Sequence, residues 1–308
     1  MSELLAYING EFVPESEARV SIYDRGYMFA DLVTESTRTF AMRPFKLSEH
    51  LDRLYDSMKA TEIDSGMTKA EMEAATLQML DRNRALFGPS DEAWIVHNVS
   101  RGVFQYKSEP GPSQQAMSTA GATVVIHCFP IDFPSFARFY AEGAHAITPS
   151  VRQVPPETLD PKIKHRSRMA GQLADLEVAR TDPDAMAVLL DRDGNLTENT
   201  GGNFFIVKDG MVRTPTTRSV LEGVSRATVL ELCVQLGIPH SEEVLQVYHA
   251  TVAEEAFVTS TPYSMLPVTR FNGRPVGDGR PGPITARLLD AWSELVGVDI
   301  VDQALAAR

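Results

Sequence analysis

The chain contains little cysteine and tryptophan and lacks the short motifs that bind structural or catalytic metals. Only two cysteines and two tryptophans occur among its 308 residues. Cys128 and Cys233 each lie in an apolar stretch, which favours buried free thiols over a disulfide or a pair of metal ligands. No CxxC or HExxH sequence is present, so we expect no metal site.

Positive charge is also scarce, because 29 Lys and Arg residues face 41 Asp and Glu residues, giving a net charge of -12 at pH 7. This balance argues against a broad surface for nucleic acid or anionic membrane, but it leaves room for a small basic site for one phosphate. No apolar run approaches the length of a membrane helix, and the N-terminus carries Glu3 without the basic segment of a signal peptide. We therefore expect a cytoplasmic protein with neither a nucleic-acid nor a membrane partner.

The length and the hydrophobic content of 43% suffice for two domains with a substantial core. Strand and helix patterns are interspersed along the chain, which predicts a mixed α+β (α/β) fold. We expect a small N-terminal α/β domain over residues 1–130, a linker over 131–137 and a larger domain over 138–308.

Turn signals indicate four β-hairpins, each an Asn-Gly or Asp-Gly pair between strand patterns. They are Asn9-Gly10, Asp193-Gly194, Asp209-Gly210 and Asn272-Gly273. Other strands are predicted at residues 32–40, 43–47, 93–100, 122–129, 144–150, 186–191 and 255–260. Residues 102–121 are rich in Ser, Gln, Gly and Pro, and we expect them to form a long loop.

Apolar residues at helical spacing predict helices whose ends carry capping signals. Ser48 can cap a first helix, and Thr68 with Glu71 forms a capping box that opens a second one. Ser225 is expected to cap a later helix that Gly237 ends. Two more helices are predicted at residues 166–181 and 283–296.

A lysine and a glutamate carry the clearest chemical signal. Lys164 lies in the stretch V151-RQVPPETLDPKIKHR, and Glu198 follows 34 positions later in D193-GNLTENTGGNFF. A lysine that can form a Schiff base, with a carboxylate that can keep a pyridine nitrogen protonated, is what pyridoxal 5'-phosphate (PLP) chemistry requires. By residue type alone, Lys162 competes with Lys164, and Glu198 could simply close the Asp193-Gly194 turn.

Six segments, in order, give the chain a family resemblance. They are the run from Tyr7 to Gly26, the "EHxxRL"-like stretch Leu47–Ser57, the Lys164 and Glu198 stretches, the "LxGxTR"-like stretch Leu221–Arg226, and Gly282–Thr285. Together they resemble the fold type IV PLP enzymes, which include branched-chain and D-amino-acid aminotransferases, (R)-amine transaminases and aminodeoxychorismate lyases. The resemblance implies a two-domain fold with a barrel-like sheet in the larger domain, PLP as the cofactor, and a homodimer.

The resemblance also implies roles for individual residues. It selects Lys164 over Lys162 as the lysine that holds the cofactor and moves the substrate proton. Glu198 would face the pyridine nitrogen, followed by Asn203 in an "ExxxxN" pattern. The phosphate would be bound by Arg53, Val224, Ser225, Ser260 and Thr261, through a guanidinium, helix N-terminal N–H groups and hydroxyls. Alternatively, Arg53 is a surface cation paired with Asp52 or Asp56, and the others are ordinary caps and turns.

Substrate residues are expected on one strand. Thr34, Ser36 and Arg38 alternate and therefore share a face, which the resemblance turns toward the pocket, with Phe29 as a wall. Arg38 could bind a substrate carboxylate or could instead pair with Glu35 or Asp31. The 102–121 loop holds no arginine, unlike the loops of the D-amino-acid and (R)-amine enzymes, and Lys107 is the cation that could substitute.

Three functions remain open at this point. The leading one is a transaminase that moves an amino group from an amino acid or primary amine to a 2-oxo acid by a ping-pong mechanism. The alternative is a lyase-like β-elimination, and the third is a non-catalytic PLP-binding or interaction protein. The stretch Val151–Pro156 resembles the (R)-amine transaminases, Lys164–Arg168 with Arg38 resembles the lyases, and Met169 replaces a tyrosine of the branched-chain enzymes.

Overall fold

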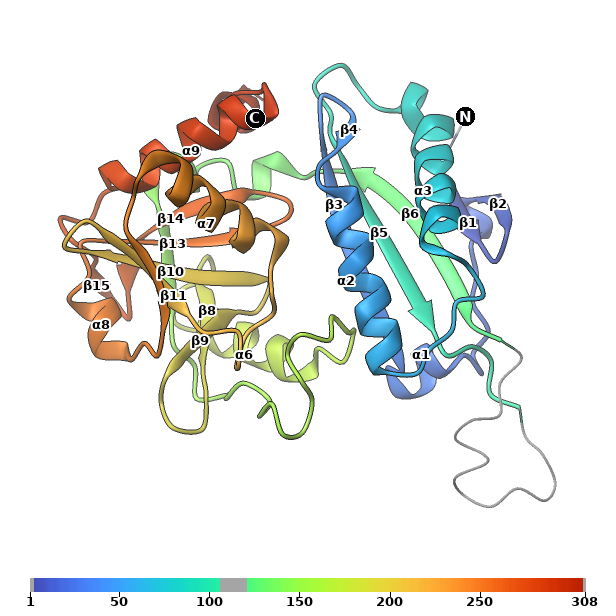
Figure 1. Cartoon of the computed structure of the whole chain (residues 1–308), viewed down its shortest axis with the longest axis horizontal. Helices are drawn as coiled ribbons and strands as arrows, with labels where there is room; N and C mark the ends of the chain where they lie inside the picture. Colours follow the sequence, from blue (N-terminus) through green and yellow to red (C-terminus); the bar gives the residue numbers. More distant parts are fainter. Residues whose placement is uncertain (1–2, 106–120, 307–308) are drawn as a thin grey trace. The chain divides into compact units, whose positions relative to one another are not determined.

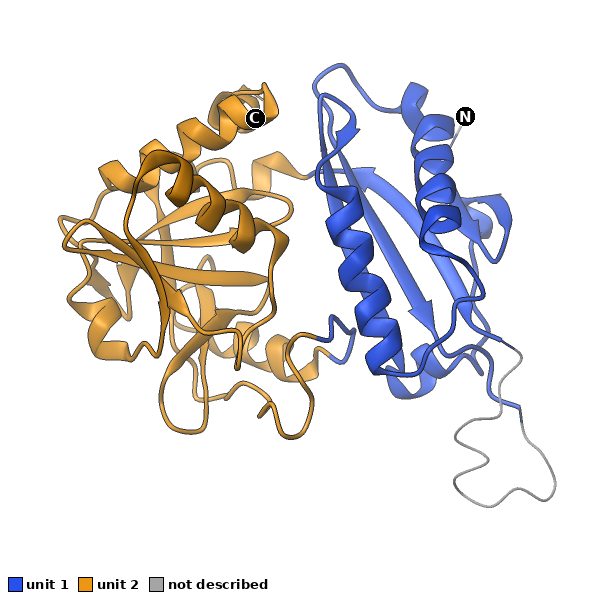
Figure 2. Cartoon of the chain, in the orientation of Figure 1, with its two compact units in different colours: residues 1–131, 163–167 blue, residues 132–162, 168–308 orange. Residues whose placement is uncertain are grey.

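The computed structural model describes residues 3–105 and 121–306, so most of the predicted 102–121 loop, with Lys107, lies outside the described residues. The chain forms two compact units (Figure 2). Unit 1 comprises residues 1–131 and 163–167, and unit 2 comprises residues 132–162 and 168–308. Residues 163–167 therefore belong to unit 1, although the boundary expected from the sequence lies at 131–137.

Unit 1 is built on an antiparallel six-stranded sheet with the strand order β2-β1-β6-β5-β3-β4 (Figure 1). Its longest strand, β3, pairs with β5 so that Leu32 lies opposite Ser100 and Arg38 lies opposite Trp94. The strands are β1 (Leu5–Ile8), β2 (Glu11–Pro14), β3 (Leu32–Phe40), β4 (Arg43–Pro44), β5 (Ala93–Ser100) and β6 (Thr123–Pro130).

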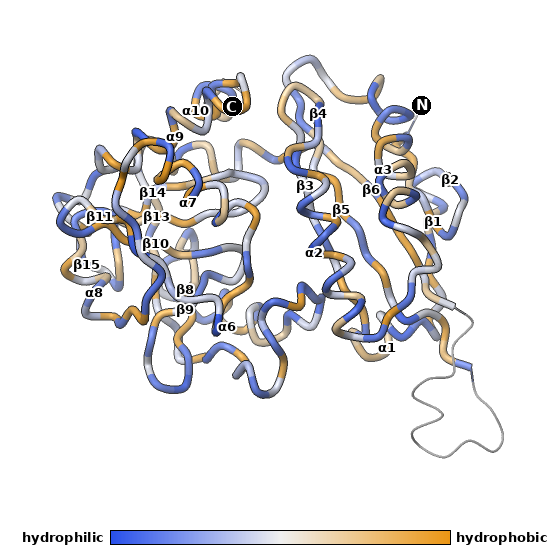
Figure 3. Tube along the Cα trace, viewed as in Figure 1, coloured by the Kyte–Doolittle hydropathy of each residue, from blue (hydrophilic) through white to orange (hydrophobic). Residues whose placement is uncertain are grey.

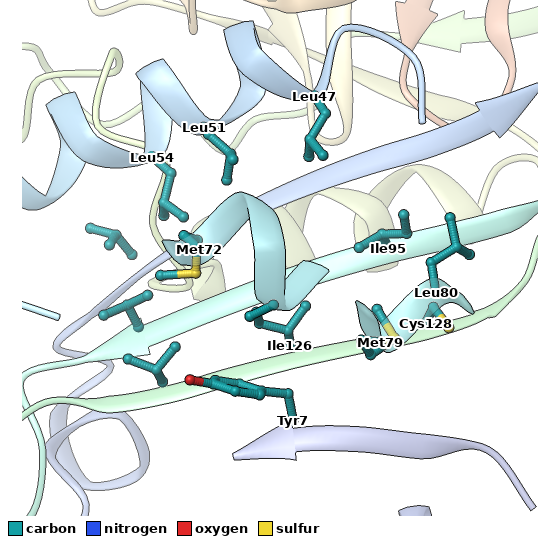
Figure 4. Close-up of a cluster of buried hydrophobic side chains, with 14 of the residues drawn as sticks. Tyr7, Leu47, Leu51, Leu54, Met72, Met79, Leu80, Ile95, Ile126 and Cys128 are labelled. Carbon is teal, nitrogen blue, oxygen red and sulfur yellow. The ribbon is translucent and has the colours of Figure 1, made fainter. Parts of the chain in front are cut away.

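Two helices, α2 (Leu47–Ala60) and α3 (Lys69–Asn83), cover one face of this sheet. Several strongly hydrophobic residues lie along β5 and β6 (Figure 3). The core between helices and strands includes Leu51, Met72, Ile95 and Ile126, all fully buried (Figure 4). The remaining helical segments of the unit are α1 (Arg25–Phe29) and the 3-10 turns η1 (Glu15–Glu17) and η2 (Arg84–Leu86).

Helix starts in unit 1 test the capping predictions. The Thr68–Glu71 capping box is present at α3 and is confirmed. The predicted Ser48 cap is wrong, because α2 begins one residue earlier, after Lys46 in the left-handed region at φ 50°. The Ser48 hydroxyl instead accepts a hydrogen bond from Lys69 Nζ at 2.9 Å, which joins the starts of α2 and α3.

Unit 2 contains a nine-stranded sheet in which six strands form a closed ring. The ring runs β10-β13-β14-β7-β8-β9, and the antiparallel β9–β10 pairing closes it. This is the barrel-like sheet expected for the larger domain. The strands are β7 (Ala144–Ile147), β8 (Met186–Leu190), β9 (Leu196–Asn199), β10 (Gly202–Lys208), β11 (Met211–Pro215), β12 (His240–Glu243), β13 (Glu255–Ser260), β14 (Ser264–Phe271) and β15 (Arg274–Pro275).

Helices of unit 2 pack around this sheet, with α7 and α9 in contact with each other and with β13. Gly237 ends α7 in the left-handed region, as predicted, but the predicted Ser225 cap is wrong. The N-cap of α7 is Gly223, so Ser225 is the second helical residue. The helices are η3 (Phe133–Ser135), α5 (Phe139–Glu142), α6 (Met169–Ala179), α7 (Val224–Leu236), α8 (Val247–Thr251), α9 (Pro283–Val296) and α10 (Ile300–Ala306).

Strand pairing confirms the four predicted hairpins, which join β1 to β2, β8 to β9, β10 to β11 and β14 to β15. Three other elements are shorter than expected by three residues or more, since the 43–47 strand ends at Pro44, the 144–150 strand ends at Ile147 and the 166–181 helix spans Met169–Ala179. Both described cysteines are free and buried, as expected. Among the described residues, no helix combines the length and the apolar character that a membrane crossing requires.

Candidate cofactor site

Arg53 lies on α2 and is held by a buried carboxylate on β3. Its Nε donates to Glu35 Oε2 at 2.8 Å and its Nη2 donates to Oε1 at 2.7 Å, which is a two-point pairing. Glu35 Oε1 also lies 3.0 Å from His50 Nδ1. Arg53 therefore pairs with Glu35, whereas the predicted alternative partners are Asp52 and Asp56. This pairing fixes the Nε–Nη2 edge of its guanidinium.

The charge state of this cluster follows from burial and pairing. Burial alone would raise the pKa of the Glu35 carboxyl, but the charge of Arg53 and the neighbouring His50 outweigh it and hold that pKa well below its usual range. Burial lowers the pKa of His50, despite the opposing effect of Glu35. At neutral pH the cluster thus contains an ionised Glu35, a cationic Arg53 and a neutral His50 that donates from Nδ1.

Lys164 lies in the 163–167 segment, which runs antiparallel beside β3. His165 bridges Val33, and the Thr34 N–H donates to the Lys164 carbonyl oxygen at 2.8 Å. The Lys164 N–H donates to Ser57 Oγ at 3.1 Å. Ser57 is one helical turn beyond Arg53, so α2 fixes both the predicted phosphate arginine and the backbone of the predicted cofactor lysine.

Lys162, the competitor, has a different environment. Its Nζ forms an ion pair with Asp160 Oδ1 at 2.9 Å, with both side chains 45% exposed. Its N–H donates to the same carboxylate oxygen at 3.0 Å. This is the pattern of a turn stabilised on the surface, and it favours Lys164 as the reactive lysine.

Glu198 lies on β9 in unit 2, and described groups of this unit donate hydrogen bonds to both of its carboxylate oxygens. Oε2 accepts from the Leu221 N–H at 2.9 Å and from Asn203 Nδ2 at 3.2 Å, and Oε1 accepts from Gln153 Nε2 at 3.0 Å. Asn203 lies opposite Glu198 in the β9–β10 pair. The alternative role for Glu198, closing the Asp193-Gly194 turn, is not seen, because that turn is held by Asp191.

Two glycines allow the segments around Glu198 to pack closely. A Cβ on Gly202 would lie 1.8 Å from the Thr259 carbonyl oxygen, and a Cβ on Gly223 would lie 2.1 Å from Asn203 Oδ1. Gly202 thus lets the start of β10 approach the backbone at the end of β13, and Gly223 lets the start of α7 approach the Asn203 side chain. Replacing either glycine would push these segments apart.

The start of α7 has the character of an anion site. The helix spans 13 residues, its N-cap Gly223 offers no side chain, and its first-turn N–H groups include those of Val224 and Ser225. Ser260 ends β13 close to Gly202, and its hydroxyl donates to the Gly201 carbonyl oxygen at 2.6 Å. Thr261 follows directly.

The predicted substrate residues on β3 have defined partners. The Thr34 hydroxyl donates to the His97 carbonyl oxygen at 2.8 Å, so its methyl group is what the side chain can offer to a ligand. Arg38 is 2% exposed, donates from Nε to the Thr39 carbonyl oxygen at 3.1 Å, and lies over the Phe40 ring at 3.9 Å. Its predicted alternative partner Glu35 is instead bound to Arg53 and His50.

Phe29, the predicted pocket wall, ends α1 and is 56% exposed, with the Arg25 guanidinium 5.2 Å from its ring centroid. Arg101 is another arginine that could bind a substrate carboxylate, but its guanidinium makes hydrogen bonds within unit 1. It donates to both oxygens of Asp31 and to the carbonyl oxygens of Thr61 and Glu62.

These residues fit PLP by their chemistry. A primary amine can react with the carbonyl of the cofactor, and a carboxylate that only accepts hydrogen bonds suits a protonated pyridine. A helix N-terminus without a side-chain cap suits a phosphate. When bound, PLP supplies an electron sink for negative charge at the substrate α-carbon. Each unit carries part of this set, since unit 1 contains Lys164 and Arg53, and unit 2 contains Glu198 and the start of α7.

Comparison with known proteins identifies the family. The model of the family described as amino-transferase class IV matches residues 32–271. The chain belongs to this family. It is a PLP-dependent aminotransferase of fold type IV, and its substrates are amino acids and keto acids.

Individual relatives cover nearly the whole chain. It is 34% identical over 301 residues to the "Putative branched-chain-amino-acid aminotransferase" of Methanocaldococcus jannaschii, spanning 96% of this chain and 99% of that protein. It is 31% identical over 284 residues to the D-alanine aminotransferase of Bacillus licheniformis, spanning 92% of this chain and 94% of that protein. The Escherichia coli branched-chain amino acid aminotransferase has a similar structure, with a TM-score of 0.86 at 27% identity, spanning 96% and 95% of the two chains.

The cofactor is supported by a further structure. The branched-chain amino acid aminotransferase of Thermobaculum terrenum was solved in its PLP form, and it matches this chain with a TM-score of 0.82 at 26% identity, covering 96% of this chain and 94% of that one. The names of the relatives favour transamination over the β-elimination and non-catalytic alternatives.

Several contacting residues escape a reading of the sequence alone. Glu35, Ser57, Gln153 and Leu221 hold the predicted site residues, but none of them is predicted as a site residue, although the last three lie in stretches that carry the family resemblance. The one usable signal is spacing. Ser57 follows Arg53 by four positions on a predicted helix, which places both on one face.

Proposed function

We propose that the protein transfers the amino group of an L-branched-chain amino acid to a 2-oxo acid, at a PLP site that includes Lys164, Arg53 and Glu198. The observation that carries the site assignment is the hydrogen bonding of Glu198, whose carboxylate accepts from three N–H donors. Such donors favour the anion, and an anion at this position would keep the pyridine nitrogen protonated.

We propose separate roles for these residues in proton transfer, phosphate binding and binding of the substrate carboxylate. Lys164 Nζ would hold the cofactor covalently until the amino group of the substrate displaces it, and the freed amine would then take the proton from the substrate α-carbon and return it at cofactor C4′. Arg53, Ser225, Thr261 and the α7 N–H groups would bind the phosphate. Arg38 would bind the substrate carboxylate, because it is the arginine on the Thr34–Ser36–Arg38 face.

The branched-chain substrate class rests on the names of the relatives and on the small side chains of that face. Thr34 has its hydroxyl turned to the His97 carbonyl, so Thr34 presents a methyl group and Ser36 a short side chain beside the lysine segment. Short side chains leave room for a branched aliphatic group.

Borohydride reduction of the holoenzyme, followed by peptide mapping, tests the lysine. We expect the adduct on Lys164, and Lys164→Ala should abolish it while Lys162→Ala retains it. An adduct on Lys162 would overturn the assignment.

A donor screen tests the substrate class. L-leucine, L-isoleucine, L-valine, D-alanine and a primary amine without a carboxylate are each offered with 2-oxoglutarate or pyruvate. We expect the highest kcat/KM for the L-branched-chain donors. A preference for D-alanine or for the amine would overturn this part of the proposal.

We further propose a homodimer, supported by exposed apolar side chains in both units. In unit 1, Ile22 and Tyr27 are 68% and 74% exposed, and along α6 of unit 2, Met169, Leu173 and Leu176 are 74%, 51% and 60% exposed. Spacing of four and three residues puts the α6 set in one stripe. Light scattering should give twice the chain mass, and an active monomer would exclude the dimer. A cytoplasmic location stays a prediction from the sequence.

A further inference from the structure

The two oxygens of the Glu198 carboxylate are held by different parts of unit 2. Oε2 is bound by groups close to β10 and α7, namely Asn203 Nδ2 and the Leu221 N–H. Oε1 is bound by Gln153 Nε2 at 3.0 Å, from the segment that leads toward Lys164. We propose that Gln153 is a positioning residue that fixes the direction of Glu198 Oε1 and so sets how firmly Glu198 holds the cofactor ring. This inference rests on the proposed role of Glu198.

The backbone of Gln153 is anchored, so its amide reaches Glu198 from a fixed point. The Gln153 N–H donates to the Leu190 carbonyl oxygen at 2.9 Å, and Arg152 forms a parallel bridge with Leu190. Leu190 ends β8, which pairs with β9, the strand that carries Glu198. Gln153 is thus tied through one strand to the strand of its hydrogen-bond partner.

The chemistry of the contact defines what Gln153 can do. An ionised carboxylate only accepts hydrogen bonds, so the Gln153 amide must turn its NH2 group toward Oε1. Each carboxylate oxygen has two lone-pair directions, and a donor fixed in one of them sets the direction of the other. The amide does this without a charge of its own and without titrating, so the charge of Glu198 is stabilised but not neutralised.

A cavity of about 250 Å³ lies against the same side chain. Gln153 lines it together with Pro155, Leu196, Thr216 and other residues of unit 2, and Glu198 is not among the described lining residues. Gln153 therefore contacts Glu198 and the cavity at once. A much shorter side chain would let water from the cavity take the place of the amide, so the informative variants keep the volume of glutamine.

Two variants separate the hydrogen bond from the packing. Gln153→Met keeps the length and removes the donor, and Gln153→Glu keeps the shape and sets a second carboxyl group against Oε1. Thr216→Val is the matched control, because it removes a hydroxyl from the same cavity and leaves the donors to Glu198 in place. The readouts are the PLP dissociation constant, the pH titration of the visible absorbance of bound PLP, and the thermal midpoint of each apoprotein.

We expect PLP to bind about ten times more weakly to Gln153→Met than to the wild type, as for the loss of one hydrogen bond to a charged group, and more weakly still to Gln153→Glu. The absorbance titration should shift in both variants and stay unchanged in Thr216→Val. The apoprotein midpoints should stay close to wild type, because the contact stabilises the ring partner rather than the fold.

Three results would overturn the inference. The first is wild-type PLP affinity and titration in both Gln153 variants, and the second is the same loss in Thr216→Val. The third is a fall in the apoprotein midpoint that accounts for the weaker binding. A wild-type protein that binds no PLP would instead refute the proposed function, so the two failures are distinct.

Discussion

Arg53 donates two hydrogen bonds to the Glu35 carboxylate in unit 1, from Nε to Oε2 at 2.8 Å and from Nη2 to Oε1 at 2.7 Å. The Glu35 side chain is fully buried and that of Arg53 is 12% exposed. The pairing links the middle of β3 to the middle of α2. The predicted phosphate residue is therefore part of the folded core of unit 1.

Glu35→Gln should lower the free energy of unfolding by about 3 kcal/mol, because removing one partner of a buried pair leaves the other charge uncompensated. Denaturant unfolding of the apoprotein measures this. Asp52→Asn is the control, since Asp52 lies on the same helix with a side chain 61% exposed and pairs with Lys69. Equal stability of the two variants would show that the Glu35 pair is no stronger than a surface pair.

Glu198→Gln should lower kcat on the order of 100-fold, as expected when a hydrogen bond to a charged group is lost at the reacting system. PLP should bind at least as weakly as to Gln153→Met, but saturating PLP should still load the variant, since Lys164 and the proposed phosphate contacts remain. Steady-state kinetics and the bound PLP content separate the two effects. Asp193→Asn, on the neighbouring turn, should behave like the wild type, and a Glu198→Gln enzyme with full turnover would contradict the assignment.

Arg38→Ala should raise the KM for amino acids and 2-oxo acids by at least about 30-fold, the lower end for losing a partner of a buried charge. PLP content and turnover of amines that lack a carboxylate should change much less. Because Arg38 also packs on Phe40, Phe40→Leu serves as a packing control. If both substrate types weaken equally, Arg38 has a structural role and the carboxylate has another partner.

His97 makes the stability of unit 1 depend on pH. Burial lowers its pKa from 6.5 to about 4. The Thr76 hydroxyl donates to the Met72 carbonyl at 2.7 Å and so accepts from His97 Nε2–H at 2.8 Å. As the pH falls, His97 is protonated in the unfolded chain before it is protonated in the folded one. The neutral, buried His97 therefore leaves the free energy of unfolding undiminished above about pH 6.5, and that free energy falls by about 3 kcal/mol toward pH 4.

Comparison of His97→Gln with the wild type isolates this effect from other titrating groups. The free energy of unfolding is measured for both proteins at pH 7.5, 6 and 5. We expect the difference between them to shrink or reverse as the pH falls, because the variant has no imidazole to protonate. A difference that stays constant over this range would refute the prediction.

Much of the local structure could be predicted from the sequence where a short-range signal decides it. The Thr68–Glu71 capping box and the Asn9-Gly10 hairpin are fixed by groups within a few residues of each other. The Ser48 and Ser225 caps failed for a physical reason. Each helix begins at an earlier residue, which places the serine inside the first turn, where its hydroxyl cannot cap the helix start.

In the candidate site, too, only the residues that carry a local sequence signal could be predicted. Lys164 and Glu198 stand in stretches that resemble a known family, so their sequence neighbours reveal them. Glu35 and Gln153 lie 18 and 45 positions from the residues they hold, and no local pattern joins such partners. Only the fold brings them together.

The placement of residues 163–167 in unit 1 has a consequence for how the protein is made. The beginning of β3 pairs with this segment, which emerges from the ribosome about 130 residues later. Until then, the Thr34 N–H at that edge lacks its backbone partner, the Lys164 carbonyl. The predicted cofactor lysine therefore reaches its place only after synthesis of unit 2 has begun, so a nascent chain cut short before residue 163 would lack both Lys164 and the backbone partner of the Thr34 N–H.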